Sequence, residues 1–129
     1  MDYTRPMSLT LLDAETIAIE LKNKPKLICI NLAGVSIKDE GMVLISKALI
    51  DNHDLETIDL SATEIGAHQN GVDALCELLR HNPKLKSLYI KFNLFENDGI
   101  IAVHKALENC TMFENFRADR YVGEVVFSK

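Results

Sequence analysis

The segments KPKLICINLAGV (residues 24–35) and NPKLKSLYIKFN (residues 82–93) share one skeleton. Each has a proline and a lysine before a leucine, and apolar residues follow that leucine three and five positions later. A chain of 129 residues that contains the same skeleton twice is expected to be built from repeated structural units. The repeat therefore decides which fold the sequence predicts.

The repeated unit starts at four places along the chain, and successive starts are 28, 30 and 28 residues apart. The first position of the unit holds Leu27, Leu55, Leu85 and Phe113. The fourth position holds Ile30, Ile58, Leu88 and Phe116, and the sixth holds Leu32, Leu60, Ile90 and Ala118. A glycine follows at Gly41, Gly71 and Gly99. Self-similarity at a fixed period predicts a stacked array of units.

Each unit combines two hydrophobic periods. Near its start the residues alternate as in a short strand, with Ile30 and Leu32 on one face and Asn31 on the other. After the glycine, apolar residues recur at the spacing of an amphipathic helix, in the first unit at Leu44, Ile45, Ala48 and Leu49. Stacked units of this kind give an α/β solenoid with parallel strands on one side and helices on the other. The strands line the concave side, because helices are wider than strands.

This pattern resembles the leucine-rich repeat family, in the ribonuclease-inhibitor-like subtype whose repeats have about 28 residues. The family skeleton is matched at Leu85, Leu88, Ile90, Asn93, Phe95 and Gly99. The resemblance covers residues 27–118 and, more loosely, residues 9–26, and it implies a short right-handed array that binds proteins. It also implies that Asn93 hydrogen-bonds the backbone of its turn. Val35 at the same position cannot do this, and Thr63 can do it only in part.

We expect a single domain, residues 1–129, with five segments. These are an N-terminal helical cap (1–26), three repeats (27–54, 55–84 and 85–112), and a terminal strand and tail (113–129). The cap shows no clear strand before its helix, and Glu20 falls at an interior helix position, which suits a cap that faces water. The second repeat has two extra residues within GAHQN (66–70), which predict a bulged loop at the rim.

The C-terminal tail follows the last predicted strand with DRYVGEVVFSK instead of a helix. Its valines and phenylalanine suit a strand that folds back along the edge of the sheet. The alternative is an open end through which two copies of the chain, or the chain and a partner, pair with each other.

The composition disfavours several classes of function. A net charge of −5 disfavours a nucleic-acid binder, which needs clustered lysine and arginine. The sequence has no apolar run long enough to span a membrane, and its N-terminus has no secretory signal pattern. Three cysteines without CxxC spacing, Cys29, Cys76 and Cys110, suit a reducing compartment. We expect a cytoplasmic protein; the alternative is a secreted effector that acts in the cytoplasm of a host.

The sequence offers no pattern for catalysis. It contains no GxSxG, no P-loop, no HExxH and no zinc-type spacing of cysteine and histidine. The histidines fall at four different positions of the repeat, namely His53, His68, His81 and His104. We therefore expect no catalytic residue, no metal and no cofactor.

The candidate binding residues are those that face the concave side. Neighbouring strands lie about 4.8 Å apart, so equivalent positions form rows across the sheet. The proposed partner-binding set consists of Asn31, Asp59, Tyr89, Lys91, Phe92, Arg117 and Asp119. Tyrosine, phenylalanine and arginine are enriched at binding hot spots, and the skeleton does not require Phe92, which falls where Gly34 and Ala62 fall. A solvated face without a partner, with Glu56, Lys86 and Glu114 as a simple charge ladder, is the alternative.

Two further surfaces stay open at this stage. Met42, Val43, Ile50, Ile100 and Ile101 lie at the border of the helical stripes, and they either extend the core or form a second interface on the convex side. Cys29 is expected on the concave strand face, where it either packs in the sheet or reacts.

The leading functional hypothesis is a non-enzymatic module that binds an unidentified protein through the concave sheet face. One alternative is a regulator of a small GTPase, because the subtype includes the Ran GTPase-activating proteins, which resemble this chain in repeat length and in the glycine-led helix. Another is a self-assembling fragment or bacterial effector that uses the open C-terminal end as a homodimer contact.

Overall fold

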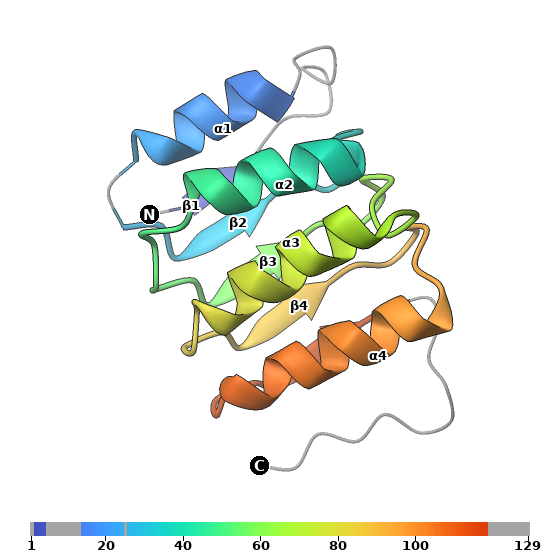
Figure 1. The fold of residues 1–129 in the computed structure, drawn as a ribbon. Helices are drawn as coiled ribbons and strands as arrows, with labels where there is room; N and C mark the ends of the chain where they lie inside the picture. Colours follow the sequence, from blue (N-terminus) through green and yellow to red (C-terminus); the bar gives the residue numbers. More distant parts are fainter. Residues whose placement is uncertain (1, 5–13, 25, 119–129) are drawn as a thin grey trace.

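The structure is a computed structural model that describes residues 2–4, 14–24 and 26–118. Within these residues the strands are β1 (Asp2–Thr4), β2 (Cys29–Asn31), β3 (Thr57–Asp59), β4 (Ser87–Tyr89) and β5 (Asn115–Arg117). The helices are α1 (Ala14–Lys22), α2 (Lys38–Ala48), α3 (Gln69–Arg80), α4 (Asn97–Ala106) and the short 3₁₀ helix η2 (Leu107–Asn109). Figure 1 shows the strands and helices alternating along the chain, as the two periods of the repeat predict.

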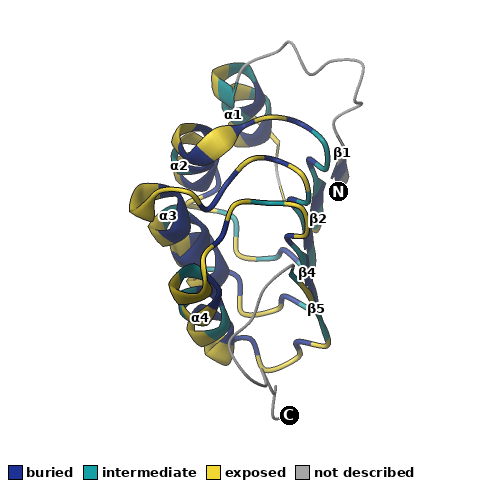
Figure 2. Cartoon of the chain, turned by 90° about the vertical axis from the view of Figure 1, so that its right-hand side faces the viewer, coloured by how far each residue is buried: buried dark blue, intermediate teal, exposed yellow. Residues whose placement is uncertain are grey.

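The strands form one parallel sheet in the order β1-β2-β3-β4-β5, and the helices cover one of its faces (Figures 1 and 2). Equivalent positions of the repeat lie side by side, since Ile30 pairs with Ile58, Ile58 with Leu88 and Leu88 with Phe116. The period of about 28 residues therefore corresponds to one strand and one helix, and the predicted α/β solenoid is confirmed. We call the sheet face without helices the open face.

The core fills the space between the sheet and the helices. Figure 2 shows buried residues both on the strands and on the helices that cover them. The sheet side contributes the first, fourth and sixth positions of the units, including Leu27, Ile30, Leu32, Leu55, Ile58, Leu60, Leu85, Leu88 and Ile90. The helix side contributes Ile17, Leu21, Ile45, Leu49, Leu75, Leu79, Val103 and Leu107. Because the layer runs through every unit, each unit buries its apolar face against its neighbours.

The buried stripe of α2 differs from the sequence prediction at one residue. Met42, Ile45 and Leu49 are buried and follow the i, i+3, i+7 spacing of one helix face. Leu44, which the repeat alignment places in the stripe, is exposed because it falls beside that face.

The border residues divide between the two interpretations. Met42 and Ile100 are buried, so they extend the core, and Val43 is half-buried. Ile50 and Ile101 are 41% and 47% exposed on the helical side. A second interface on that side remains a prediction for those two residues.

Asn93 joins two neighbouring turns, as the family resemblance implies. Its Oδ1 accepts hydrogen bonds from the backbone N–H groups of Thr63 (2.9 Å) and Ile65 (3.2 Å). Its Nδ2 donates to the carbonyls of Leu60 (2.8 Å) and Ile90 (3.1 Å). Thr63 supplies a smaller version of this role, because its hydroxyl donates one bond to the Leu60 carbonyl at 2.7 Å.

The expectation of an N-terminal cap without a strand is wrong. Asp2–Thr4 forms β1 and pairs with β2, with Tyr3 beside Ile30. A strand of three residues presents only one side chain to the core, here Tyr3, and this is too short for alternation to be recognised. The Tyr3 hydroxyl donates a hydrogen bond to Glu20 Oε1 at 2.9 Å, which explains the charged residue at the interior position of α1.

The two extra residues of the second repeat belong to a loop that encloses a buried carboxylate. Asp39 is buried, and its Oδ1 and Oδ2 accept hydrogen bonds from the backbone N–H groups of Gly66 (2.7 Å) and His68 (3.1 Å). A Cβ at residue 71 would lie 1.7 Å from Asp39 Oδ1, so the close approach requires Gly71. The expected bulged loop thus has a structural partner in α2 that the sequence did not identify.

The predicted terminal strand is confirmed by β5, which pairs in parallel with β4. The predicted tail strand and the candidate residue Asp119 lie outside the described residues.

Candidate protein-binding face

The predicted row of side chains exists on the open face. Asn31 pairs with Asp59, Asp59 with Tyr89 and Tyr89 with Arg117 in the register of the sheet. The fifth position of the repeat thus forms one line across β2 to β5, as the repeat alignment predicts.

The side chains of this row differ in the hydrogen bonds that they make. Asn31 Oδ1 accepts a hydrogen bond from Ala33 N–H at 3.0 Å, and Asp59 Oδ1 accepts one from Ser61 N–H at 3.0 Å. Both side chains therefore fix the turn that follows their own strand. Tyr89 holds the same position in the next unit, but it cannot make such a bond because its hydroxyl lies at the far end of the ring. Arg117 is exposed, with its Nη1 donating to the Phe116 carbonyl at 3.1 Å.

Phe92 combines an exposed ring with an unfavourable backbone. Its side chain is 72% exposed, and its φ is +62°. The equivalent residues Gly34 and Ala62 also have positive φ, at +84° and +56°. The turn therefore requires a left-handed residue at this position, which costs a non-glycine residue about 1–2 kcal/mol. Lys91 Nζ lies 5.6 Å from the centre of the Phe92 ring, within the range of a cation–π contact.

Leu94 is a second exposed apolar residue, two positions after Phe92, and the sequence prediction did not include it. Its side chain is 51% exposed at the rim. The equivalent residues of the other units are Ser36 and Glu64, and the Ser36 hydroxyl donates a hydrogen bond to the Glu64 carboxylate. An apolar residue at a position that is polar in the other two units was the signal available in the sequence.

These residues form what we call the β4–β5 cluster: Tyr89, Lys91, Phe92, Leu94 and Arg117. Beside it, Lys86 Nζ lies 3.4 Å from Glu56 Oε1, so this rung of the predicted charge ladder forms. Both side chains of the pair are partly exposed, and an ion pair of this kind adds little stability. Lys91 and Arg117 are the cluster's own cations. The cluster therefore presents aromatic, aliphatic and cationic groups together.

The three cysteines lie in different environments, and none of them forms a disulfide bond. Cys29 is half-buried on β2, while Cys76 and Cys110 are buried. Burial raises the pKa of the Cys110 thiol to about 11, and burial also raises the pKa of Cys76. A raised thiol pKa favours the neutral, unreactive form.

We expect a thiol reagent at pH 8 to label Cys29 first in the folded protein, and to label all three cysteines once the protein is unfolded. Mass spectrometry of peptides from a time course measures the order. Labelling of Cys110 in the folded protein at the rate of Cys29 would contradict the burial that the structure shows.

Among residues 2–4, 14–24 and 26–118, no group of three or more histidine, cysteine, aspartate or glutamate side chains is placed to hold a metal ion. Over the same residues, no helix combines the length and the apolar character that crossing a membrane requires.

No protein-family model matches the chain. Among solved structures, it is similar to a tropomodulin C-terminal domain from the structural genomics of Caenorhabditis elegans. The TM-score is 0.61 at 19% sequence identity, and the match covers 84% of this chain and 65% of that one. The chain therefore spans less than two thirds of the length of the chain it matches.

At this identity the likeness shows the fold alone. The parallel sheet, the covering helices and this neighbour fit a leucine-rich repeat. The finer assignment to the ribonuclease-inhibitor-like subtype stays a prediction from the sequence.

Proposed function

We propose that this protein is a non-enzymatic binding module that holds a protein partner on the open face, at the β4–β5 cluster. The observation that carries the proposal is Phe92, which is 72% exposed at a position where the backbone favours glycine. The left-handed backbone opposes folding, and a ring that stays this exposed offsets little of that cost through burial. Residues that reduce stability without a structural benefit are typical of functional sites.

The chemistry of the cluster indicates what the partner offers. Phe92 and Leu94 give exposed apolar area, and Tyr89 combines an apolar ring with a hydroxyl that forms hydrogen bonds. Lys91 and Arg117 attract carboxylates, and arginine can bind a carboxylate through two hydrogen bonds. The partner surface therefore has a hydrophobic pocket beside acidic side chains.

The remaining predicted residues have lesser parts in the proposal. Asn31 and Asp59 fix their own turns, so they hold the neighbouring part of the open face in shape. Asp119 stays a sequence prediction. Three cysteines outside disulfide bonds are consistent with a cytoplasmic location, which is part of the same proposal.

Phe92→Gly tests the proposal, because it removes the ring and relieves the backbone at the same time. We expect the free energy of unfolding to rise by up to about 1 kcal/mol, since glycine adopts positive φ without strain. We expect capture of the partner from a cell lysate to fall about tenfold or more, as for the loss of a hot-spot aromatic.

The matched control is Ala62→Gly, which makes the same backbone change on the preceding unit without removing an aromatic ring. It should leave capture unchanged. If Phe92→Gly captures the same protein in the same yield as the wild type, the β4–β5 cluster is not the binding site.

A further inference from the structure

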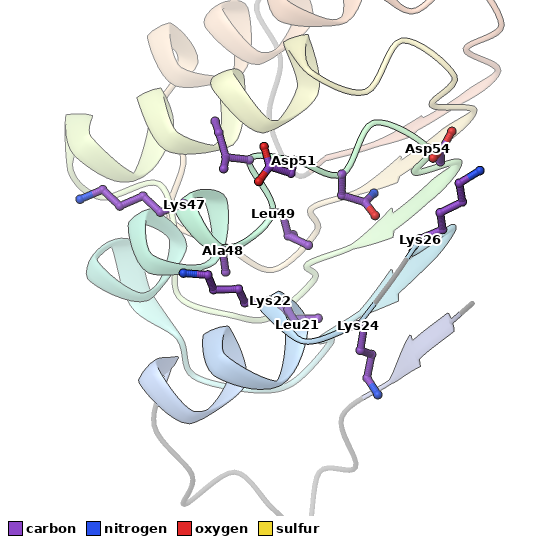
Figure 3. Close-up of a pocket in the computed structure, with 11 residues that line it drawn as sticks. Leu21, Lys22, Lys24, Lys26, Lys47, Ala48, Leu49, Asp51 and Asp54 are labelled. Atoms are coloured by element: carbon purple, nitrogen blue, oxygen red, sulfur yellow. The ribbon is translucent and has the colours of Figure 1, made fainter.

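A second charged surface lies at the opposite end of the strands, near the N-terminal units. A pocket of about 550 Å³ opens between the C-terminal ends of α1 and α2 and the loops that lead into β2 and β3 (Figure 3). Its charged lining consists of Lys22, Lys24, Lys26, Lys47, Asp51 and Asp54. We call this pocket the lysine groove.

The lysine groove has an excess of positive charge in a chain whose net charge is −5. Asp54 Oδ1 lies 2.7 Å from the ammonium of Lys84, a further lysine that is not part of the pocket lining. The hydrogen bond from Lys84 lowers the pKa of the Asp54 carboxyl, which is therefore ionised and already paired. The charge of Lys26 lowers that pKa as well. The lining therefore holds four lysines against Asp51 and an Asp54 carboxylate that Lys84 also pairs, which leaves an excess of positive charge.

Helix geometry explains two of the four lysines. Lys22 and Lys47 lie in the last turns of α1 and α2, where a cation interacts favourably with the helix dipole. Lys24 and Lys26 lie beyond the end of α1, in the loop before β2. The dipole effect falls off within the last turn of a helix, so it does not account for them.

The repeat pattern does not explain Lys24 either. This residue stands where later units have Asn52 and Asn82. Those asparagines join adjacent units, because their Oδ1 atoms accept hydrogen bonds from the backbone N–H groups of Leu27 (2.8 Å) and Leu55 (3.0 Å). Lys24 instead extends its ammonium to 6.0 Å from the ring of Tyr3. The N-terminal cap thus has a cation in the lining of the pocket, at the position where the next two units have a structural amide.

The directions of the side chains indicate the shape of the ligand. In Figure 3, Lys22 and Lys47 extend to one side of the groove, and Lys24 and Lys26 extend from the loop on the other side. They do not converge on one point, so a single small anion cannot contact all of them. An extended ligand with several separate negative charges can.

We propose that the lysine groove binds an acidic peptide segment of a partner protein, with carboxylates on both sides of the segment reaching the two pairs of lysines. Nucleic acid fits less well, because the lining contains no aromatic side chain on which a base could stack. The net charge of −5 also opposes a long polyanion more strongly than a short acidic segment.

Fluorescence anisotropy with a labelled hexaglutamate peptide tests this proposal on the full chain at low salt. We expect Lys24→Gln/Lys26→Gln to weaken peptide binding about tenfold, because each exposed ion pair adds a fraction of the binding free energy. The matched control is Lys38→Gln/Lys105→Gln, which changes the net charge by the same amount on exposed residues outside the groove. It should leave the affinity unchanged, and circular dichroism should show that both variants fold.

Three results would overturn the proposal. The first is no binding of hexaglutamate to the wild type at low salt. The second is equal weakening by the groove and control pairs, which would assign the effect to net charge. The third is tighter binding of hexathymidylate than of hexaglutamate with the same loss on Lys24→Gln/Lys26→Gln, which would assign the groove to nucleic acid. The proposal is independent of the β4–β5 cluster, since none of the substituted lysines belongs to it.

Discussion

The variant Tyr89→Ala/Lys91→Glu/Arg117→Glu is expected to lose capture of the partner while it keeps its fold. It removes an amphipathic ring and reverses both cations of the β4–β5 cluster. Lys91 and Arg117 are exposed and Tyr89 is half-buried on the open face, so the core remains intact. A hot-spot loss together with two like-charge contacts is expected to weaken binding about a thousandfold, or about 4 kcal/mol.

A pull-down from cell lysate followed by mass spectrometry measures this effect. The control Lys38→Glu/Lys105→Glu changes the net charge by the same −4 on exposed residues away from the cluster, and it should still capture the partner. Matching circular dichroism spectra would establish that all three proteins fold. Capture of the same protein by the triple variant would place the interface elsewhere, on the helices or at the C-terminal end.

Leu88→Ala is expected to lower the free energy of unfolding by about 2–5 kcal/mol, the range for large-to-small changes in a core. Leu88 is fully buried in β4 and lies between Ile58 and Phe116 in the sheet register. The resulting cavity would lie inside the stacked array, where the packed units on both sides prevent neighbouring side chains from moving in to fill it. In a domain of this size that loss is a large part of the total stability.

Denaturant unfolding followed by circular dichroism measures this loss in the free energy of unfolding. Leu94→Ala is the matched control, because it makes the same chemical change in the same unit at a side chain that is 51% exposed. It should change the free energy of unfolding by less than about 0.5 kcal/mol. Equal losses for the two variants would mean that β4 does not pack as the structure shows.

The fold was predictable because the same pattern of apolar residues occurs several times along the chain. The first, fourth and sixth positions recur in four units, and each recurrence is a separate observation of a strand that faces the core. The same redundancy is missing at the ends. β1 has a single core residue, Tyr3, so no alternation marks it as a strand.

Contacts between units were harder to predict than the units themselves. The buried carboxylate of Asp39 accepts hydrogen bonds from the backbone of Gly66 and His68, about one repeat further along the chain. No local pattern links an acid in the first turn of one helix to the N–H groups before the next. The Asn93 bonds were predictable only because the family resemblance supplies a role for that position.

The candidate site was predictable as a row but not as a cluster. Strand spacing and register place Asp59, Tyr89 and Arg117 side by side, and the structure confirms this. The sequence does not reveal that the Asp59 carboxylate already accepts a hydrogen bond from the turn after its strand, or that Phe92 has positive φ. Those two observations move the candidate interface from the whole row toward β4 and β5.

The most direct test of the proposed interface is an NMR titration of the ¹⁵N-labelled chain with the captured partner. The central claim predicts that the largest shift changes occur in residues 86–94 and 114–117, which contain β4, β5 and the turn with Phe92. Changes confined to α2, α3 and α4, with the open face unaffected, would contradict it.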